Sequence, residues 1–373
     1  MNQFTEQSRK KLDIKRIDTD FVAGLSSIPY VINVPDGDWR AWFTDTEKQL
    51  LRWDTNGCSQ YSSIKTLEAQ CNRLLNKGAF SSEALTFFDK NKYLIDGQFN
   101  FSIEYNAILS GTTINGNNPI YCFISAQKDG LIPQWMLEMT LEQSQQYNSQ
   151  EEQDAAFYSV SRVTQAMRDM GRESLKYISV AYQWIGAQHY IQPTFQQMQT
   201  AMLQAPLTIA VPVPANVYLW NNDTVSYDGK KELDHCVGIN LVSIKVNDAF
   251  PFYIYDNYNP FQKRLSRDYY IPQVLQGIVT AITPPVEAPI LPLAGFNITL
   301  PLSATYPISL KAIVQTYLLQ NRLLQDNVAT FFMPSGFWGQ QTTESVKNYQ
   351  TKYMLKLTGY IDPDTMAHIQ KYG

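Results

Sequence analysis

The stretch Asp54-Thr-Asn-Gly-Cys-Ser-Gln-Tyr-Ser-Ser-Ile-Lys-Thr-Leu-Glu-Ala-Gln-Cys-Asn-Arg-Leu-Leu-Asn-Lys-Gly78 decides the fold. It begins with four residues typical of tight turns, and Cys58 follows them directly. Gly78 is a stop signal for a helix. Between the two, apolar side chains recur at helical spacing, namely Tyr61, Ile64, Leu67, Cys71, Leu74 and Leu75. The sequence therefore predicts a buried helix that begins at Cys58.

Cys58 is a candidate nucleophile because of this position. Backbone N–H groups at the start of a helix are unpaired and carry the positive end of the helix dipole, so they favour a thiolate over a thiol. The alternative is that Cys58 is a small buried apolar residue, as most cysteines are. The cysteine alone does not decide between the two.

A thiolate nucleophile needs a base, and the chain has three histidines. His368 lies in a C-terminal helical segment, and His189 lies in a loop that Pro193 soon ends. His235 opens the apolar, β-branched run Asp234-His-Cys-Val-Gly-Ile-Asn-Leu-Val-Ser-Ile, which reads as a buried strand. A histidine at the mouth of a buried strand can be held towards a cleft, so His235 is the candidate base.

A second strand, Pro251-Phe-Tyr-Ile-Tyr-Asp-Asn-Tyr-Asn-Pro, ends at Asn257. Two adjacent strands would bring Asn257 close to His235, where the amide oxygen could orient the imidazole. Nucleophile, base and orienting residue then follow in the order Cys, His, Asn. The alternative is that Asp-Asn-Tyr-Asn-Pro forms an ordinary turn.

These residues resemble motifs of the papain-like cysteine peptidases. Cys58-Ser-Gln-Tyr-Ser-Ser is similar to the segment around the family's nucleophile, and Ala205-Pro-Leu-Thr-Ile-Ala-Val is similar to its Gly-Pro-Val-x-Val-Ala strand. Asp234-His-Cys-Val-Gly and Tyr253-Ile-Tyr-Asp-Asn-Tyr resemble the segments of its histidine and asparagine. The resemblance implies an α+β fold with a helical lobe and an antiparallel β lobe, and a cysteine endopeptidase that uses no cofactor and no metal. It also implies substrate contacts at Asp234.

The sequence also departs from the family. The spacing between Cys58 and His235 exceeds the usual 130–150 residues or so, which requires an insertion. Asn259 stands where a tryptophan normally shields the asparagine. Arg52 stands where the glutamine of the oxyanion hole is expected, so Gln49 is the nearest candidate and Asn56 the fallback. One oxyanion donor lowers the barrier by about 3–4 kcal/mol.

Composition narrows the function classes. The chain has 373 residues, of which 44% are hydrophobic and 13% aromatic, as in globular proteins of two or three domains. A net charge of −4 without a basic stripe argues against nucleic acid as a partner. The four cysteines lack the spacing of a structural zinc site, and Cys71 and Cys122 are either a disulfide or, as we expect, inert thiols. No stretch reads as a signal peptide or a membrane span.

Changes in composition and in apolar pattern along the chain predict four parts: an N-terminal arm at 1–45, a papain-like domain at 46–282, a proline-rich linker at 283–296 and a C-terminal domain at 297–373. In the second part we expect helices at 81–91, 120–126 and 193–204, solvent-facing helices in 140–180, and strands at 178–184, 207–213, 235–246, 252–256 and 269–278. The loop at 111–118, with Gly111 and Thr112, is a candidate substrate contact, and a plain surface loop is its alternative.

The C-terminal part resembles the small three-helix peptidoglycan-binding domain. Gly336-Phe-Trp-Gly-Gln-Gln-Thr-Thr-Glu-Ser-Val-Lys-Asn-Tyr-Gln and Leu357-Thr-Gly-Tyr-Ile-Asp-Pro-Asp-Thr match its two motifs, and Trp338 is the candidate glycan contact. Helices are expected at 309–326, at 342–353 and after Asp362, with Pro363 in the first position.

The two resemblances together predict a cysteine peptidase that acts on peptidoglycan, with stem peptides and glycan as partners. We interpret it as a phage endolysin or a tail-associated virion enzyme, present in the virion or in the host cytoplasm before release and acting at the bacterial cell wall. The N-terminal arm could contact other virion proteins. Two alternatives are a catalytically silent virion structural protein and a peptidase that acts on protein substrates.

Overall fold

A computed structural model describes residues 3–5, 30–43, 49, 51–186, 191–282, 340–360 and 362–372. The described residues up to Ile282 belong to one compact unit, and those from Gln340 onward belong to a second. The linker predicted at 283–296 and the helix predicted at 309–326 lie outside the described residues.

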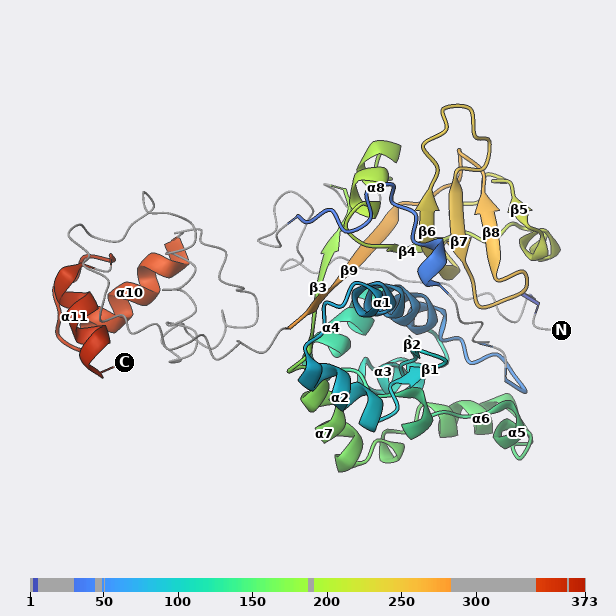
Figure 1. Cartoon of the computed structure of the whole chain (residues 1–373). Coiled ribbons are helices and arrows are strands. Elements are labelled where there is room, and N and C mark those ends of the chain that lie inside the picture. The colour runs from blue at the N-terminus through green and yellow to red at the C-terminus, as the bar shows by residue number, and fades with distance from the viewer. Residues whose placement is uncertain are drawn as a thin grey trace. The chain divides into compact units, whose positions relative to one another are not determined.

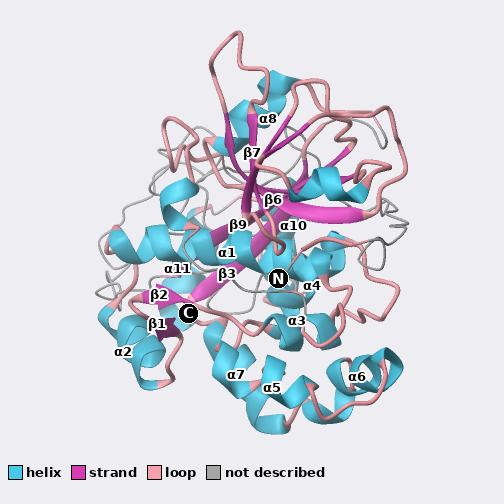
Figure 2. Cartoon of the chain, turned by 90° about the vertical axis from the view of Figure 1, so that its right-hand side faces the viewer, coloured by secondary structure: helices cyan, strands magenta, loops and turns pink. Residues whose placement is uncertain are grey.

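The first unit is built around one buried helix, α1 (Cys58–Asn76), which begins at Cys58 as the sequence predicts. The helix lies between a sheet and a group of smaller helices (Figures 1 and 2). On its two sides it contacts β4 (Leu207–Val211), β6 (His235–Val242), β9 (Gln273–Ala281), α3 (Ile103–Leu109) and α4 (Pro119–Asp129). Because α1 is covered on both sides, even its polar residues, such as Ser63 and Gln70, are buried.

The helical half holds short elements with side-chain caps. Ser81 accepts the Ala84 N–H at the start of α2 (Ser82–Lys90), and Thr140 and Gln143 form a reciprocal capping box at the start of α5. The predicted helices in 140–180 are α5 (Leu141–Ser144), α6 (Gln150–Phe157) and α7 (Gln165–Ser174). A two-stranded hairpin, β1 (Leu94–Ile95) and β2 (Gln98–Phe99), completes this half.

The other half is a seven-stranded sheet in the order β3-β9-β4-β6-β7-β8-β5. All neighbours are antiparallel except β8 and β5, which are parallel. The strands not yet defined are β3 (Ile178–Trp184), β5 (Thr224–Val225), β7 (Phe252–Tyr255) and β8 (Gln262–Leu265), and α8 (Phe195–Met202) packs on β6.

The mixed α+β class with an antiparallel-rich sheet is thus confirmed. Several strand boundaries differ from the prediction: β4 ends at Val211, β6 at Val242 and β7 at Tyr255, and β9 runs from Gln273 to Ala281. The polar strand β8, Gln-Lys-Arg-Leu, was not predicted because it lacks an apolar pattern.

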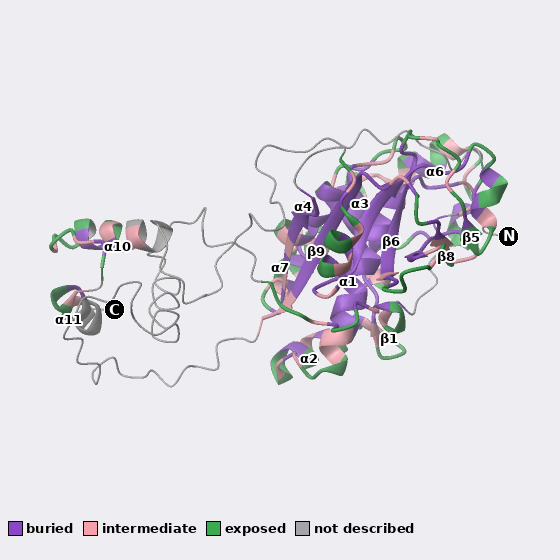
Figure 3. Ribbon diagram, turned by 90° about the horizontal axis from the view of Figure 1, so that it is seen from above, coloured by how far each residue is buried: buried purple, intermediate pink, exposed green. Residues whose placement is uncertain are grey.

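Two large apolar clusters, among several, hold the first unit together. One joins α1 to the helical half and to β3 and β9, with Ile64, Leu67 and Phe123 fully buried. The other joins α8 to the central strands and includes Met202 and Ile254. Figure 3 shows α1, β6 and β9 as largely buried elements. The start of α1 and the start of β6 therefore lie in the buried interior of the unit.

The segment 30–43 runs along the β half of the first unit. Trp39 is 1% exposed, and its indole N–H donates to the Met202 carbonyl at 2.7 Å. Its backbone N–H donates to the Asn240 carbonyl at 2.8 Å. This segment is therefore anchored to both α8 and β6.

In the second unit the structure describes α10 (Gln340–Lys352) and α11 (Pro363–Tyr372), close to the predicted bounds. The fully buried Gln350 joins them: its amide group donates to Thr358 Oγ1 at 2.8 Å and to Thr365 Oγ1 at 3.0 Å, and accepts the Gly359 N–H at 2.9 Å. Asp362 caps α11 by accepting the Thr365 N–H. The motif residues of this unit thus have structural roles.

Close packing of α1 and α4 on the sheet depends on Gly277 of β9. A Cβ atom added there would lie 2.3 Å from Cε1 of Phe123 and 3.0 Å from Cδ2 of Leu67. We expect Gly277→Ala to lower the free energy of unfolding by about 1–3 kcal/mol, because it overpacks this contact. Chemical denaturation measures the change.

Gly238→Ala on β6 is the matched control, because its added Cβ would meet Thr66 only at an ordinary contact distance of 3.4 Å. If both variants lost equal stability, the steric explanation would be wrong.

Candidate active site

Cys58 is the first residue of α1, and its side chain is 2% exposed. The residue before it, Gly57, is the N-cap and has no side chain that could cap the helix. The backbone N–H groups of the first turn therefore act on the sulfur, as expected for a helix N-terminus.

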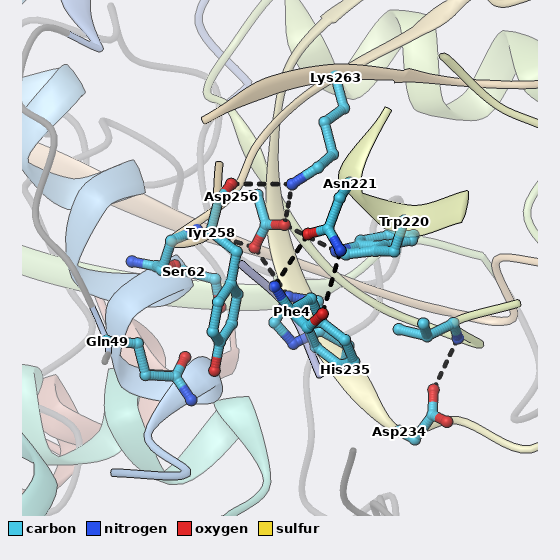
Figure 4. A network of polar contacts seen from close by, with 12 residues as sticks. Phe4, Gln49, Ser62, Trp220, Asn221, Asp234, His235, Asp256, Tyr258 and Lys263 are labelled. Atoms are coloured by element: carbon cyan, nitrogen blue, oxygen red, sulfur yellow. Dashed lines mark hydrogen bonds and ion pairs between the residues drawn. The ribbon is translucent and has the colours of Figure 1, made fainter. Parts of the chain in front are cut away.

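His235 is the first residue of β6 and is 1% exposed. Its Nε2 lies 2.8 Å from Oδ1 of Asp256, the residue after β7 (Figure 4). That bond leaves Nδ1 for Cys58, and the thiol and the imidazole are close enough to shift each other's pKa. The structure thus brings the predicted nucleophile and base together.

The carboxylate of Asp256 is the centre of a buried polar network. Oδ1 accepts the Asn257 backbone N–H at 2.7 Å in addition to the His235 contact. Oδ2 accepts the Trp220 indole N–H at 2.7 Å and contacts Lys263 Nζ at 2.5 Å. Burial raises the pKa of Asp256, but the charges of Lys263 and His235 outweigh it and hold that pKa below its usual range.

Lys263 is a buried cation that sequence reasoning missed. Its side chain is fully buried on β8, where Nζ contacts Asp256 and donates to the Tyr258 carbonyl at 2.9 Å. Burial lowers its pKa, and Asp256 opposes this effect. Lys263 and Asp256 form a buried ion pair behind the imidazole, so the negative charge on Asp256 is balanced.

The electrostatics favour a charged Cys58–His235 pair. A hydrogen bond with Cys236 and contact with His235 outweigh burial and lower the pKa of Cys58 to about 5. Burial lowers the pKa of His235, but Asp256 and the Cys58 sulfur raise it to about 10. Between these values the site holds a thiolate and an imidazolium, the reactive form of a cysteine nucleophile.

The structure corrects the prediction for Asn257, because the side chain that contacts the imidazole belongs to Asp256. Gly238 lies opposite Tyr255, so the same register sets Val237 opposite Asp256. Side chains two residues apart share a face of a strand, so His235, Val237 and Asp256 lie on one face. Asn257 contacts the same carboxylate through its backbone N–H.

Because Asp256 rather than Asn257 contacts the imidazole, the aromatic position two residues further on is Tyr258 and not Asn259, and the ring centroid of Tyr258 lies 5.6 Å from that of His235. A tryptophan, Trp220, covers the orienting residue as well. Trp220 comes from a 3-10 helix, η5 (Val217–Asn221), between β4 and β6. Its ring centroid lies 5.5 Å from that of His235, at an interplanar angle of 88°. The tryptophan is thus supplied by another segment, which no motif in the sequence indicated.

Gln49 and Asn56, the two predicted oxyanion donors, both contact Asp54. Gln49 Nε2 donates to Asp54 Oδ1 at 2.9 Å, and the Asn56 N–H donates to the same oxygen at 2.8 Å. The Tyr258 hydroxyl donates to Asp54 Oδ2. Asp54 thus links both candidates to a residue that packs on His235, and their oxyanion role stays a prediction.

The two predicted substrate contacts in the loop at 111–118 differ in exposure. Gly111 is exposed in the left-handed region, with φ 74°, while Thr112 is buried and contacts the Gln60 amide. Ser59 Oγ donates to the Asn117 carbonyl at 2.5 Å, which ties this loop to the residue beside Cys58. The loop is thus within reach of the site, and its substrate role stays a prediction.

Asp234 has structural partners: Oδ1 accepts the Val213 N–H at 2.7 Å, and Oδ2 pairs with Lys230. A substrate role for Asp234 stays a prediction. Trp338 and His189 lie outside the described residues.

The four cysteines are free and buried. Burial raises the pKa values of Cys71 and Cys122, in line with inert thiols. Within the described ranges there is no group of three or more His, Cys, Asp or Glu side chains that could hold a metal ion. A search of the same ranges found no helix long and apolar enough to cross a bilayer.

Comparison with known proteins gave two kinds of match. Residues 312–369 match the family model described as "Putative peptidoglycan binding domain", inside the segment for which the sequence predicts that domain. The search of curated proteins found no match.

Three similar solved structures are cysteine proteases or their precursors. The recombinant stem bromelain precursor has a TM-score of 0.41 and 13% identity over 65% of this chain and 69% of its own. The Amb a 11 cysteine protease of ragweed pollen, in its proform, has 0.41 and 14% over 70% and 68%. The bromelain protease from Ananas comosus has 0.39 and 13% over 65% and 97%.

The first prediction from this geometry concerns the residue that orients His235. Asp256→Asn removes the negative charge that keeps the imidazole protonated, so the thiolate loses its counter-charge. We expect the pKa of Cys58 to rise by about 1–3. Ultraviolet absorbance of the thiolate as a function of pH, with the Cys58→Ala protein subtracted, measures it.

Asn257→Ala should leave this titration unchanged, and Asp256→Asn combined with Lys263→Met should show the same rise without an unpaired buried lysine. A higher pKa of Cys58 in Asn257→Ala, with no rise in either Asp256 variant, would favour Asn257 as the residue that orients His235.

The second prediction concerns Lys263. Lys263→Met leaves the Asp256 carboxylate buried without its partner, so we expect a loss of about 3–5 kcal/mol of stability at neutral pH. The depressed pKa of Asp256 contributes stability above the ordinary carboxyl pKa of about 4 and loses it as pH falls. The difference in free energy of unfolding between Lys263→Met and the parent should therefore become smaller below that pH. Denaturant unfolding at a series of pH values measures it.

Lys176→Met is the control, because the exposed Lys176–Glu173 pair is open to solvent. A Lys263→Met protein as stable as this control would show that the buried pair contributes nothing.

Proposed function

We propose that this protein is a cysteine peptidase that cleaves peptides of bacterial peptidoglycan. The observation that carries the proposal is the buried set of Cys58, His235 and Asp256, with the thiol at a helix N-terminus and the imidazole held between it and a carboxylate. The peptidoglycan-binding match at residues 312–369 supports the wall polymer as the substrate. The sequence resemblance to papain-like peptidases agrees with this chemistry.

In the proposed reaction the Cys58 thiolate attacks the carbonyl carbon of a peptide bond. Negative charge develops on the carbonyl oxygen, where the Cys58 backbone N–H and the Gln49 amide are the proposed donors. Each such donor contributes more in a dry site than in water, and Cys58 is nearly excluded from solvent.

His235 then gives the Nδ1 proton to the nitrogen of the leaving amine, so the carbon–nitrogen bond breaks and a thioester remains on Cys58. A water molecule, deprotonated by the same nitrogen, attacks the thioester and releases the carboxylate product. Asp256 holds Nε2 throughout and thereby fixes which nitrogen faces the sulfur. Lys263 and Trp220 act through Asp256 as positioning residues.

The C-terminal unit has a separate role in this proposal. A module that binds the wall polymer raises the local concentration of peptide bonds around the peptidase. Loss of this unit should therefore reduce activity on intact wall material more than activity on soluble peptides. The narrower prediction, a phage endolysin or a tail-associated enzyme, stays a prediction from the pairing of the two parts.

Purified protein should release fragments from cell-wall sacculi, and Cys58→Ala should reduce the release by at least about a thousandfold, because the nucleophile is gone. Mass spectrometry of the fragments identifies the bond, since a peptidase leaves one new amine and one new carboxylate within a peptide. Cys71→Ala is the matched control, a buried cysteine of the same helix whose raised pKa makes it inert.

Equal release by the parent and Cys58→Ala would contradict the proposal. Cleavage of casein with untouched sacculi would favour the alternative of a peptidase for protein substrates.

A further inference from the structure

Residues 52–55, which lead into the start of α1, are held by one segment of the helical half, residues 144–158. The first of them is bound at two places. The Arg52 N–H donates to Ser144 Oγ at 3.0 Å, and the Arg52 guanidinium donates to the Gln145 carbonyl at 2.8 Å. The chain just before the nucleophile is thus fastened to the end of α5.

Gln153 of α6 holds both backbone groups of the next residue, Trp53. Gln153 Oε1 accepts the Trp53 N–H at 3.1 Å, and Gln153 Nε2 donates to the Trp53 carbonyl at 2.9 Å. A carboxamide offers the one acceptor and one donor that such a pair of bonds requires. The side chain of Gln153 is fully buried, so its amide cannot exchange these bonds for bonds to water. A helix 100 residues further along the chain therefore fixes the position of Trp53.

The next two carbonyl groups point to the same segment. Gln150 Nε2 donates to the Asp54 carbonyl at 3.1 Å, and the Tyr158 hydroxyl donates to the Thr55 carbonyl. Because a peptide unit is planar and trans, a carbonyl that is held on one side directs the N–H of the following residue to the other side. The Asn56 N–H accordingly points away from Tyr158, and it donates to Asp54 Oδ1 at 2.8 Å.

The conformation of this loop needs support from outside. Asn56 is buried with φ 57°, in the left-handed region that few residues other than glycine adopt, and such a conformation persists only where the surroundings hold it. Two residues later comes the Cys58 N–H, one of the two donors proposed for the oxyanion. A catalytic group must lie within about 0.5 Å of its productive position. A shift of residues 53–55 would reach Cys58 directly, because only Asn56 and Gly57 lie between them.

The supporting segment is itself attached to the rest of the helical half. Phe157 of α6 is buried in one apolar cluster with Ala107 of α3. Just beyond α6, the Arg162 guanidinium pairs with the buried carboxylate of Glu104, also on α3. The side chains that hold the loop therefore stand on a helix that is fixed to its neighbour by packing and by an ion pair.

We propose that α6 is a positioning element of the catalytic site and that its central residue is Gln153. By holding the backbone of Trp53, while Gln150 and Tyr158 hold the two carbonyl groups that follow, it places the Cys58 N–H for the developing oxyanion. The proposal deepens the peptidase function proposed above and rests on it for the reaction. The ordering of the loop by α6 does not require that function. Since Gln153 and Gln150 act through the backbone, the acidity of the Cys58 thiol should not depend on them.

The first test measures the loop itself, by amide hydrogen exchange and mass spectrometry of a peptide that covers residues 52–58. Gln153→Met keeps the volume of the side chain but removes both bonds to Trp53, so exchange in this peptide should become about tenfold faster or more. Gln150→Met removes one bond and should give a smaller increase. Glu151→Gln is the matched control, an exposed neighbour on α6 that should leave exchange unchanged.

The second test separates the oxyanion donor from the thiolate. Iodoacetamide reacts at a saturated carbon and needs only the thiolate, whereas para-nitrophenyl acetate passes through a tetrahedral intermediate with a negatively charged oxygen. In the latter reaction Cys58 attacks the ester carbonyl, para-nitrophenolate leaves and an acetyl thioester remains. In Gln153→Met we expect acylation to fall by about tenfold to a hundredfold, and alkylation to stay within about twofold of the parent. Nitrophenolate release, with the Cys58→Ala protein subtracted, and peptide mapping of alkylated Cys58 measure the two rates.

Gln150→Met is the milder variant, because Gln150 is only half-buried. It should lower acylation in the same direction and by less, again without a change in alkylation. It carries both tests if Gln153→Met does not fold.

Equal exchange in the parent, Gln153→Met and Gln150→Met would overturn the ordering of the loop by α6. Acylation that is unchanged, or that falls together with alkylation, would overturn the oxyanion role. An unreactive Cys58 in the parent, or both effects without release from sacculi, would contradict the proposed function and leave the ordering by α6 in place. Release from sacculi by Gln153→Met at the parental rate would contradict the positioning role alone.

Discussion

The buried carboxylate of Asp256 is the interaction on which the site depends. An isolated carboxylate at this depth would be protonated or would destabilise the fold, since removing a charge from water is costly. Four donors prevent this: His235, Trp220, the Asn257 N–H and Lys263. Because Lys263 neutralises Asp256, the thiolate and imidazolium in front stand beside a pair with no net charge. The Asp256 carboxylate still raises the pKa of His235, while the hydrogen bond with Cys236 and the contact with His235 lower that of Cys58.

The fold brings the site residues together because α1 packs closely against the sheet. Cys58 belongs to a helix and His235 to a strand, so they meet only because α1 crosses the sheet at short distance. Gly277 allows that distance, as it leaves room for Phe123 and Leu67 over β9. Both reacting residues are the first in their elements, where side chains are positioned by rigid neighbours and yet reach a boundary between the two halves. The position of the Cys58 sulfur therefore depends on the packing of α1 against β9, at a distance from the sulfur itself.

Local patterns in the sequence were enough for α1, for most strands and for the choice of Cys58 and His235 as neighbours in one site. Periodicity defines a buried helix that begins at Cys58, and β-branched residues define the strand of His235. The orienting residue was misplaced by one position, because it depends on the register between β6 and β7, and that register shifts between Ile239 and Leu241. Lys263 escaped notice because a lysine in a polar strand signals a surface. Gln153 was beyond reach, as its partner Trp53 is 100 residues away in the chain.

The origin of Trp220 has a consequence for how the site tolerates changes in the chain. Its indole comes from the connection between β4 and β6, whereas Tyr258 lies in the segment of Asp256 itself. The two rings reach the imidazole from separate stretches of the sequence. An insertion in either stretch would therefore displace one ring and leave the other in place.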